Sequence, residues 1–373
     1  MSLKLFDAKS IHLLGKKGRE GGSVPYLETL VKKGVDHFFQ NISADLQLLK
    51  VGSHLLPVLI PEQKENAYVC SPYHHYIAYG LKFSKEMKLP FLRYCGTPFM
   101  KKFGQLVRIG QIEKVVYVNH WLFSTDLYPE DFSKGEIFAI VSFLKKKYPD
   151  LAIVFRSLNP LINEGLMADL QEMGFNLIAS RQVHLTDTRN EELFQTRIHK
   201  SDLRLWNKTG FQIEEKEKLS KEEVTDVLKL YNVHNISGHS SLNPQPNQRF
   251  LFLQDHYLRF KMIKNNKRLL GVAGYYEKDG VMVCPFFGYD PSFSEHTTIY
   301  RLLSTALLLE AKKRQLIFHQ SAGATFYKQV RRAKSCIESM AVYSEHLPLK
   351  QRVSWKMLKT VINLFGPRFM RKY

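Results

Sequence analysis

Apolar and polar positions follow the same order in two stretches of the chain, one in the middle and one near the end. Residues 134–186 predict a helix, an apolar strand, a short helix and a second strand. Residues 299–343 predict the same four elements. The predicted bounds are 134–147, 151–157, 161–173 and 175–185, and then 299–314, 315–321, 324–333 and 335–343. Because internal similarity indicates duplication, we expect two similarly built units. The alternative is chance recurrence of a common α/β order.

The rest of the first unit shows helical and strand patterns of varying strength. Residues 27–38 fit a helix, and 46–51 with 54–60 fit a hairpin around Gly52 and Ser53. The segments 66–83 and 106–122 are rich in Val, Tyr and Ile and predict further strands.

The second unit is expected to open with a basic helix over 196–210, which Gly210 would end as a C-terminal cap. Ser220 to Glu223 form a capping box before an amphipathic helix over 224–235. The remaining elements are expected as a strand over 211–217, a helix over 247–264, and a hairpin of 268–277 and 280–287 around Lys278 and Asp279.

A polar stretch over 187–193 lies between the two units and marks the predicted boundary. We therefore expect domains over 1–188 and 189–346, followed by a tail over 347–373. The fold class is α/β in an α+β layered form, in which each domain has a mixed central sheet flanked by helices.

The formal net charge is +19, and such a field attracts anions such as nucleic acid, lipid headgroups or phosphorylated cofactors. A lysine-rich proteome is the alternative origin of the charge. No apolar run is long enough to span a membrane, and the N-terminus lacks a signal-peptide pattern. The four cysteines are far apart, which favours reduced thiols in a cytoplasmic protein and no metal site.

The element order of the second unit is similar to that of the GNAT superfamily of acetyltransferases. The segment His319–Lys334 resembles the stretch S-A-G-A-x-x-F-K-x-x-R-G-A of GNAT-like proteins related to Fem-type peptidyltransferases. The whole chain resembles their tandem architecture, with two GNAT-like domains of which the first is degenerate. This resemblance implies an acyltransferase that moves an acyl or aminoacyl group from a thioester or ester to an amine, with the acceptor in a cleft between the domains.

Acyl-CoA is the donor that the superfamily implies, and no permanently bound cofactor is expected. GNAT enzymes that use it carry [Q/R]-x-x-G-x-[G/A] before the long helix, where backbone amides hold the pyrophosphate. Residues 287–300 have one glycine and two carboxylates instead. Fem-type relatives also lack the motif and use aminoacyl-tRNA, which suits the positive charge. A non-catalytic protein of this fold that binds anions or nucleic acid is the further alternative.

The resemblance places the reaction near 286–289 and 319–321, where the fourth and fifth strands splay. Candidate catalytic residues there are His319, Gln320, Ser321 and Tyr327. Candidate donor-binding residues are Phe287, Gly288, Tyr289, Tyr300, Lys328, Arg331 and Arg332. In this fold the loop between the first two helices often lines the acceptor site, so the candidates after the 224–235 helix are His239, Ser240 and Asn243. Each assignment has a structural alternative. In these alternatives the histidine forms its hydrogen bonds inside the domain, the tyrosine packs on the sheet, and the basic residues form a solvated helix face.

The tail from Lys350 to Tyr373 has seven Lys or Arg residues and no acid. Trp355, Leu358, Ile362 and Phe365 share one helical face. Such a helix either lies on an anionic membrane at the inner face or docks on its own domain. Membrane contact would suit an envelope-precursor or lipid acceptor; a small-molecule amine is the other candidate, and tRNA the candidate macromolecular partner.

Overall fold

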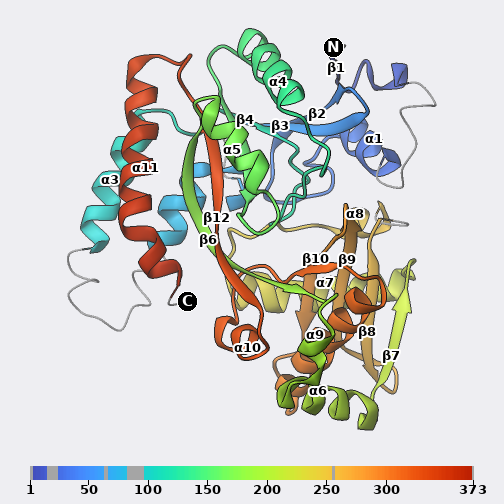
Figure 1. The fold of residues 1–373 in the computed structure, drawn as a ribbon. Coiled ribbons are helices and arrows are strands. Elements are labelled where there is room, and N and C mark those ends of the chain that lie inside the picture. The colour runs from blue at the N-terminus through green and yellow to red at the C-terminus, as the bar shows by residue number, and fades with distance from the viewer. Residues whose placement is uncertain (1–2, 15–23, 63–65, 82–95, 254–256, 372–373) are drawn as a thin grey trace. The chain divides into compact units, whose positions relative to one another are not determined.

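The computed structural model describes residues 3–14, 24–62, 66–81, 96–253 and 257–371 (Figure 1). The chain forms two compact units. Unit 1 contains residues 1–20, 27–181 and 337–372, and unit 2 contains 21–26, 182–336 and 373. Each unit therefore includes residues from both halves of the sequence. The domain bounds 1–188 and 189–346, which come from the repeat pattern, stay a prediction. The bounds of the two compact units differ from them.

Unit 1 is built on a mixed sheet in the order β1-β2-β3-β4-β5-β12. Only β4 and β5 are parallel, with Val115 opposite Ala152 and Val118 opposite Phe155. The helices α4 and α5 pack on this sheet, and their apolar residues share one core with the strands. The elements are β1 (Leu3–Phe6), α1 (Val24–Lys33), β2 (Ala44–Val51), β3 (His54–Pro61), α3 (Thr97–Ile109), β4 (Val115–Val118), α4 (Lys134–Lys147), β5 (Ala152–Leu158), α5 (Glu164–Glu172), β12 (Lys334–Tyr343) and α11 (Leu349–Met370).

Unit 2 has the strand order β6-β11-β10-β9-β8-β7. Here β10 and β11 are the parallel pair, and α9 packs on the sheet through Ile299, Leu302 and Leu303. The elements are β6 (Asn176–Asp187), α6 (Arg197–Lys208), β7 (Gln212–Lys216), α7 (Lys221–Tyr231) with a π-helical extension (Asn232–Ser237), α8 (Gln248–Leu253), β8 (Arg259–Asn265), β9 (Arg268–Lys278), β10 (Val281–Tyr289), α9 (His296–Lys313), β11 (Ile317–His319) and α10 (Thr325–Val330).

The final strand of each repeat pairs with strands of the other repeat. The C-terminal half of β6 pairs antiparallel with β11, with Leu185 opposite His319. In unit 1, β12 pairs antiparallel with β5, with Tyr343 opposite Ile153. The unit boundaries consequently fall within β6 and β12. The α/β fold class and the mixed sheet flanked by helices are as the sequence predicts, whereas this exchange is not visible in the pattern.

Most predicted elements are confirmed within a few residues. Both four-element stretches form, as do the hairpins β2–β3 and β9–β10. The Ser220–Glu223 capping box is present, with each side chain bonded to the other residue's backbone amide. Asp279 and Gly280, with φ of 48° and 75°, make the left-handed turn between β9 and β10.

Three predictions are wrong. Residues 66–83 form helical turns over their described part, because Ser71 and Glu113 accept hydrogen bonds from the amides of His74 and Tyr73. Residues 106–122 contain the end of α3 before the short β4. The described part of residues 247–264 forms the short α8 and then the strand β8. In addition, α6 ends at Thr209 in extended conformation, so Gly210 is not the cap.

The C-terminal tail is a helix that docks on unit 1. Trp355, Leu358 and Ile362 of α11 are buried, whereas Phe365 is half exposed. The shared apolar face is thus used mainly for packing, as the docked alternative predicts. Across the described segments, we find no helix whose length and hydropathy together suffice to cross a bilayer.

Candidate functional site

The parallel pairing of β10 and β11 in unit 2 is short. It covers three residue pairs and ends at Val283 and His319, while β10 continues to Tyr289 along β9. A bulge interrupts β10 between Val283 and Phe286. After β11 the chain follows β6 instead, since the amide of Gln320 donates to the carbonyl of His184 (2.8 Å). The two strands therefore part at the position where the sequence places the site.

Aromatic rings from three elements line the part of β10 beyond this point. We call His234, Phe287, Tyr289, Tyr300 and Tyr327 the aromatic row. Ring centroids are 4.7 Å apart for His234 and Tyr289, 6.0 Å for Tyr289 and Tyr300, and 4.9 Å for Tyr300 and Tyr327. All five side chains are partly exposed. The structure thus joins three predicted donor-binding residues and one predicted catalytic residue, and it adds His234, which the sequence prediction missed.

His234 lies in the π-helical extension of α7. Burial, and then the neighbouring His239, lower the pKa of His234 to about 4, so its imidazole is neutral at neutral pH. Asn235 holds the extension against β10 by donating from Nδ2 to the carbonyl of Phe287 (2.6 Å). Gly288 permits this approach, because a Cβ there would lie 2.7 Å from the backbone carbonyl of Leu230. The extension therefore fixes a neutral imidazole beside the free part of β10.

The predicted acceptor residues follow this extension directly. The rings of His239 and His234 meet edge to face at 4.9 Å, which places His239 at the end of the aromatic row. Ser240 is buried and its hydroxyl accepts from the amide of Leu242. Asn243 donates to the carbonyl of Asn235 (2.7 Å). His239 thus faces the row, whereas Ser240 and Asn243 shape the loop.

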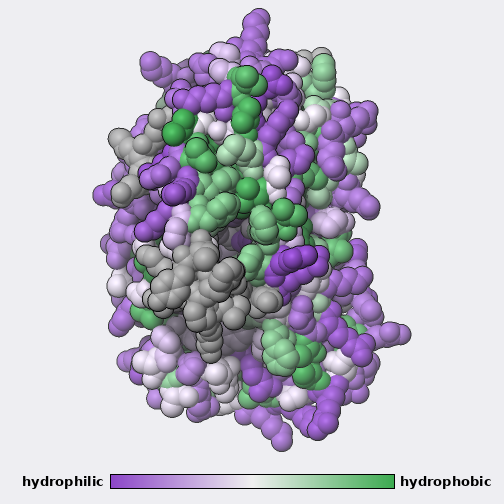
Figure 2. Space-filling model, turned by 90° about the vertical axis from the view of Figure 1, so that its left-hand side faces the viewer, coloured by the Kyte–Doolittle hydropathy of each residue, from purple (hydrophilic) through white to green (hydrophobic). Residues whose placement is uncertain are grey.

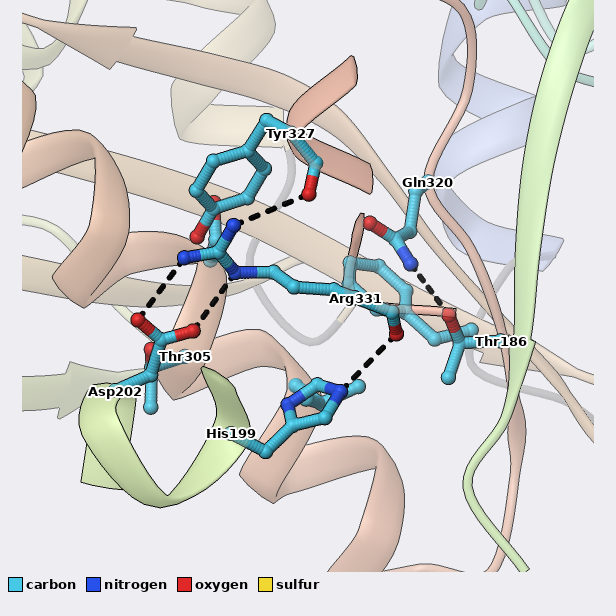
Figure 3. Close-up of a pocket in the computed structure, with 10 residues that line it drawn as sticks. Thr186, His199, Asp202, Thr305, Gln320, Tyr327 and Arg331 are labelled. Carbon is cyan, nitrogen blue, oxygen red and sulfur yellow. Dashed lines mark hydrogen bonds and ion pairs between the residues drawn. The ribbon is translucent and has the colours of Figure 1, made fainter. Parts of the chain in front are cut away.

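Tyr327 and Arg331, both from the α10 segment, lie on the side of unit 2 formed by α6 and α9 (Figure 3). The Arg331 guanidinium stacks on the Tyr327 ring at 3.5 Å. Arg331 also donates from Nε and Nη2 to the two oxygens of Asp202 on α6 (2.7 and 3.0 Å). Burial raises the pKa of Tyr327, so its phenol keeps its proton at neutral pH. Because two N–H groups of Arg331 donate to the Asp202 carboxylate, Arg331 has fewer N–H groups with which to bind a phosphate.

A small cavity lies between these groups. Its volume is about 20 Å³, room for about one water molecule. The lining residues include Thr186, His199, Asp202, Gln320, Tyr327 and Arg331 (Figure 3). Gln320 donates from Nε2 to Thr186 (2.6 Å), and His199 bonds the carbonyl of Arg331 (3.1 Å). A space of this size is too small for a substrate, and Tyr327 lies between it and the rest of the aromatic row.

The other residues predicted around β11 are mainly occupied with one another. The Nδ1 of buried His319 accepts from the amide of Ser321 (3.2 Å), which leaves the proton of a neutral ring on Nε2. Ser321 has φ of 58°. The buried Lys328 ammonium donates to the carbonyls of Gln320 (2.7 Å), Ser321 and Ala322. Lys328 thus clamps the 320–322 turn, and His319 lies beneath it rather than in the aromatic row.

The loop from β10 to α9 does not fit the diphosphate of acyl-CoA. Asp290 occupies it and accepts from the amide (2.9 Å) and hydroxyl (2.6 Å) of Ser292, while its other oxygen pairs with Arg268 (2.5 Å). A diphosphate here would meet a carboxylate and a loop amide that is already bonded. Arg332 is exposed with φ of 61° and is the remaining predicted cation of this region.

Unit 1 has a second polar cluster beyond its own parallel pair. Asp126 is buried and contacts Nδ1 of His120 and Nη1 of Arg156, each at 3.2 Å. Burial opposes ionisation of Asp126, but His120 and Arg156 together hold its pKa below the usual value. Cys70 lies 3.6 Å from the Nε2 of His120. Burial raises the pKa of Cys70 strongly, so the thiol stays protonated.

A further ion pair belongs to the same unit. Arg181 donates to Glu338 (2.5 Å), the carbonyl of Ser124 (2.7 Å) and the hydroxyl of Thr125 (2.9 Å). Sequence reasoning missed these groups; His120 and Asp126 follow β4, whereas Arg156, Arg181 and Glu338 lie within strands. Within the described ranges, no group of three or more His, Cys, Asp or Glu residues is arranged to hold a metal ion.

Comparison with solved structures identifies the architecture. No family model matches the sequence, and no curated protein matches it. FemX superposes with a TM-score of 0.54 at 10% identity over 95% of this chain and 100% of its own. A tandem GNAT protein from the clavulanic acid pathway covers 91% of this chain and 98% of its own at 10% identity, with a TM-score of 0.41.

The structure of L-PGS from Bacillus licheniformis covers 66% of this chain and 83% of its own, with 11% identity and a TM-score of 0.47. Of these three likenesses, the one to FemX establishes the fold, and at 10% identity it leaves the activity open. The superposition on FemX over 95% of this chain shows that the two chains share one fold.

Proposed function

We propose that the protein is an acyltransferase that moves an acyl or aminoacyl group from an activated ester to a primary amine, with the aromatic row of unit 2 as its reacting site. The observation that carries the proposal is the early end of the β10–β11 pairing at Val283 and His319. Beyond it, no strand of the described residues pairs with β10 on that side, and its partly exposed rings offer an acyl or aminoacyl group a surface to bind.

The chemistry needs an acceptor for the amine proton and a donor for the leaving oxygen. The amine nitrogen attacks the ester carbonyl, the new C–N bond forms, and the C–O bond to the leaving alcohol breaks. His234 is neutral, and it takes up the proton that the amine nitrogen loses and returns it to Tyr327 through solvent after the leaving group has departed. Tyr327 keeps its proton. Its hydroxyl is buried in the structure, so it supplies this proton to the leaving oxygen only after the ring turns toward the aromatic row. Lys328 acts as a positioning residue, because it holds the 320–322 turn beside this space.

The donor that suits these residues best is an aminoacyl ester of tRNA. Asp290 in the β10–α9 loop would repel the diphosphate of acyl-CoA, which the superfamily otherwise implies. The net charge of +19 favours a polyanionic donor. The acceptor is a small-molecule or envelope-precursor amine, and a site of action at the cytoplasmic face of a membrane would suit the second of these.

The test compares donors first and then residues. The purified chain is mixed with a radiolabelled aminoacyl-tRNA pool or with acetyl- and longer acyl-CoAs, together with a set of primary amines, and amide products are read by mass spectrometry. We expect transfer from aminoacyl-tRNA and none from acyl-CoA. Tyr327→Phe should lower the transfer rate by about 100-fold or more with unchanged donor affinity. Tyr343→Phe in unit 1 is the matched control and should transfer normally.

Other outcomes have defined meanings. Transfer from acyl-CoA would show the donor assignment to be wrong while keeping the reaction class. Salt-sensitive tRNA binding without transfer to any amine would favour a non-catalytic nucleic-acid-binding protein of this fold. Equal rates for the wild type, Tyr327→Phe and His234→Gln would move the reaction away from the aromatic row, and the buried cluster of unit 1 would then be tested next.

A further inference from the structure

Two helices of unit 1, α3 and α11, lie side by side (Figure 1). Their contact is close at one end, where a Cβ on Gly110 would overlap the side chain of Ser354. Gln351 donates to Gln111 at the same end (3.0 Å). The inner faces of the pair are buried through Phe103 and Val107 of α3 and Trp355 and Leu358 of α11. The pair is therefore a fixed part of unit 1.

The outer face of this pair is apolar to an unusual degree. Phe99, Leu106 and Ile109 of α3 recur at helical spacing, and Leu364 and Phe365 belong to the last turns of α11. These five side chains, which we call the α3–α11 patch, are each between 50% and 64% exposed. Figure 2 shows hydrophobic side chains gathered on this side of the molecule, bordered by hydrophilic ones. Large exposed patches of this kind mark an interaction site.

The charge of the same two helices limits what can bind there. The α3 sequence contains three Lys or Arg residues and the α11 sequence contains five, and neither contains an acid. Glu345, in the turn before α11, pairs with Arg352 and Lys356 of its first turns. Lys101 and Lys102 are exposed beside Phe99, and Arg368 is exposed beside Phe365. The patch is thus apolar in the middle and basic at its border.

We propose that the α3–α11 patch binds the surface of an anionic lipid bilayer, with its apolar side chains at the level of the acyl chains and its basic side chains among the headgroups. Amphipathic helices with this division of residues lie in the bilayer interface. A second copy of this chain is the disfavoured occupant, because a symmetric contact would bring two basic faces together. The proposal is independent of the transferase function, since it concerns binding only.

Vesicle co-sedimentation of the full chain tests the proposal. One set of vesicles is phosphatidylcholine alone, and the other is an equimolar mixture of phosphatidylcholine and phosphatidylglycerol. We expect partitioning onto the mixed vesicles to exceed that onto phosphatidylcholine by about tenfold or more. The triple variant Phe99→Ser, Leu106→Ser and Leu364→Ser should lose about tenfold in partitioning to the mixed vesicles. Lys101→Glu with Lys102→Glu should weaken the preference for the anionic lipid.

The matched control is Phe138→Ser on α4, which removes an equally large side chain that is 65% exposed in the same unit. It should partition like the wild type, and circular dichroism should show all variants folded. Absence of binding to mixed vesicles would overturn the proposal, as would unchanged binding of the triple variant. Loss of a dimer in the triple variant, measured by light scattering without lipid, would assign the patch to a second copy instead.

Discussion

Asp202 holds two arginines of unit 2, so its neutralisation should destabilise that unit strongly. Arg331 binds it through two hydrogen bonds, and Arg301 donates to Oδ1 from Nη2 (2.7 Å) and Nε (3.1 Å). Asp202 is 3% exposed, and the Arg331 side chain is 14% exposed. The substitution Asp202→Asn keeps the shape and leaves two guanidinium groups facing each other without a counter-charge.

The size of the effect follows from the burial of each partner. Removal of one partner from a buried ion pair costs about 3–5 kcal/mol. The Arg301 side chain is 35% exposed and can reach water, so we expect the lower end, about 3 kcal/mol, for Asp202→Asn. Arg301→Met should cost only about 1 kcal/mol, because Arg331 still neutralises Asp202. The double variant should cost less than the sum, because removal of Arg301 relieves part of the repulsion.

The assay must separate unit 2 from unit 1, since the chain has two compact units that need not unfold together. Hydrogen exchange with mass spectrometry during a urea titration does so, through peptides from α6 and α9. Peptides from α4 report unit 1 and should be unchanged. A destabilisation of unit 2 below about 0.5 kcal/mol for Asp202→Asn would refute the reasoning, because exposed pairs contribute amounts of that size.

Two further predictions concern unit 2. Gly288→Ala should destabilise it by about 1–3 kcal/mol in urea titrations, because the new Cβ meets backbone atoms at the end of α7. The control is Gly135→Ala on α4, where no atom lies within 4 Å of the new Cβ, and it should be neutral or stabilising. Burial, and then Lys328, lower the pKa of His184 to about 4, and its side chain is fully buried. Its unfolded form binds a proton below about pH 6.5, so the stability of unit 2 should fall by up to about 3 kcal/mol as the pH drops toward 4; a His184→Gln variant with an unchanged pH slope between those values would contradict this assignment.

The repeated order of helix and strand could be predicted because its apolar periods are long and regular. The helix α9 and the strand β5 are each buried along the face that the pattern indicates. The prediction of a strand over 66–83 was wrong for a physical reason. Its aromatic residues fit a strand equally well, and the choice of helical turns depends on Glu113, which lies about 40 residues away in sequence. A local pattern contains no trace of such a contact.

The candidate site was predicted in part. Phe287, Tyr289, Tyr300 and Tyr327 come together because β10, α9 and α10 meet in the predicted order. Asp202 was missed, although it is the single acid in an otherwise basic helix, which is a signal that such a residue pairs within the fold. His234 was missed because its role depends on the π-helical extension and on its buried pKa, and neither is a property of spacing.

The exchange of final strands explains why a boundary drawn from the sequence divides unit 2. Both β6 and β12 follow a short helix and carry buried apolar positions, so either could pair with β5 or β11 on pattern alone. In the structure β12 pairs with β5, and the end of β6 pairs with β11. As a result, His184 and Thr186, which precede the polar stretch at 187–193, belong to unit 2 and bond Thr325 and Gln320 there. The polar stretch separates two repeats in sequence, while the residues that build unit 2 come from both sides of it.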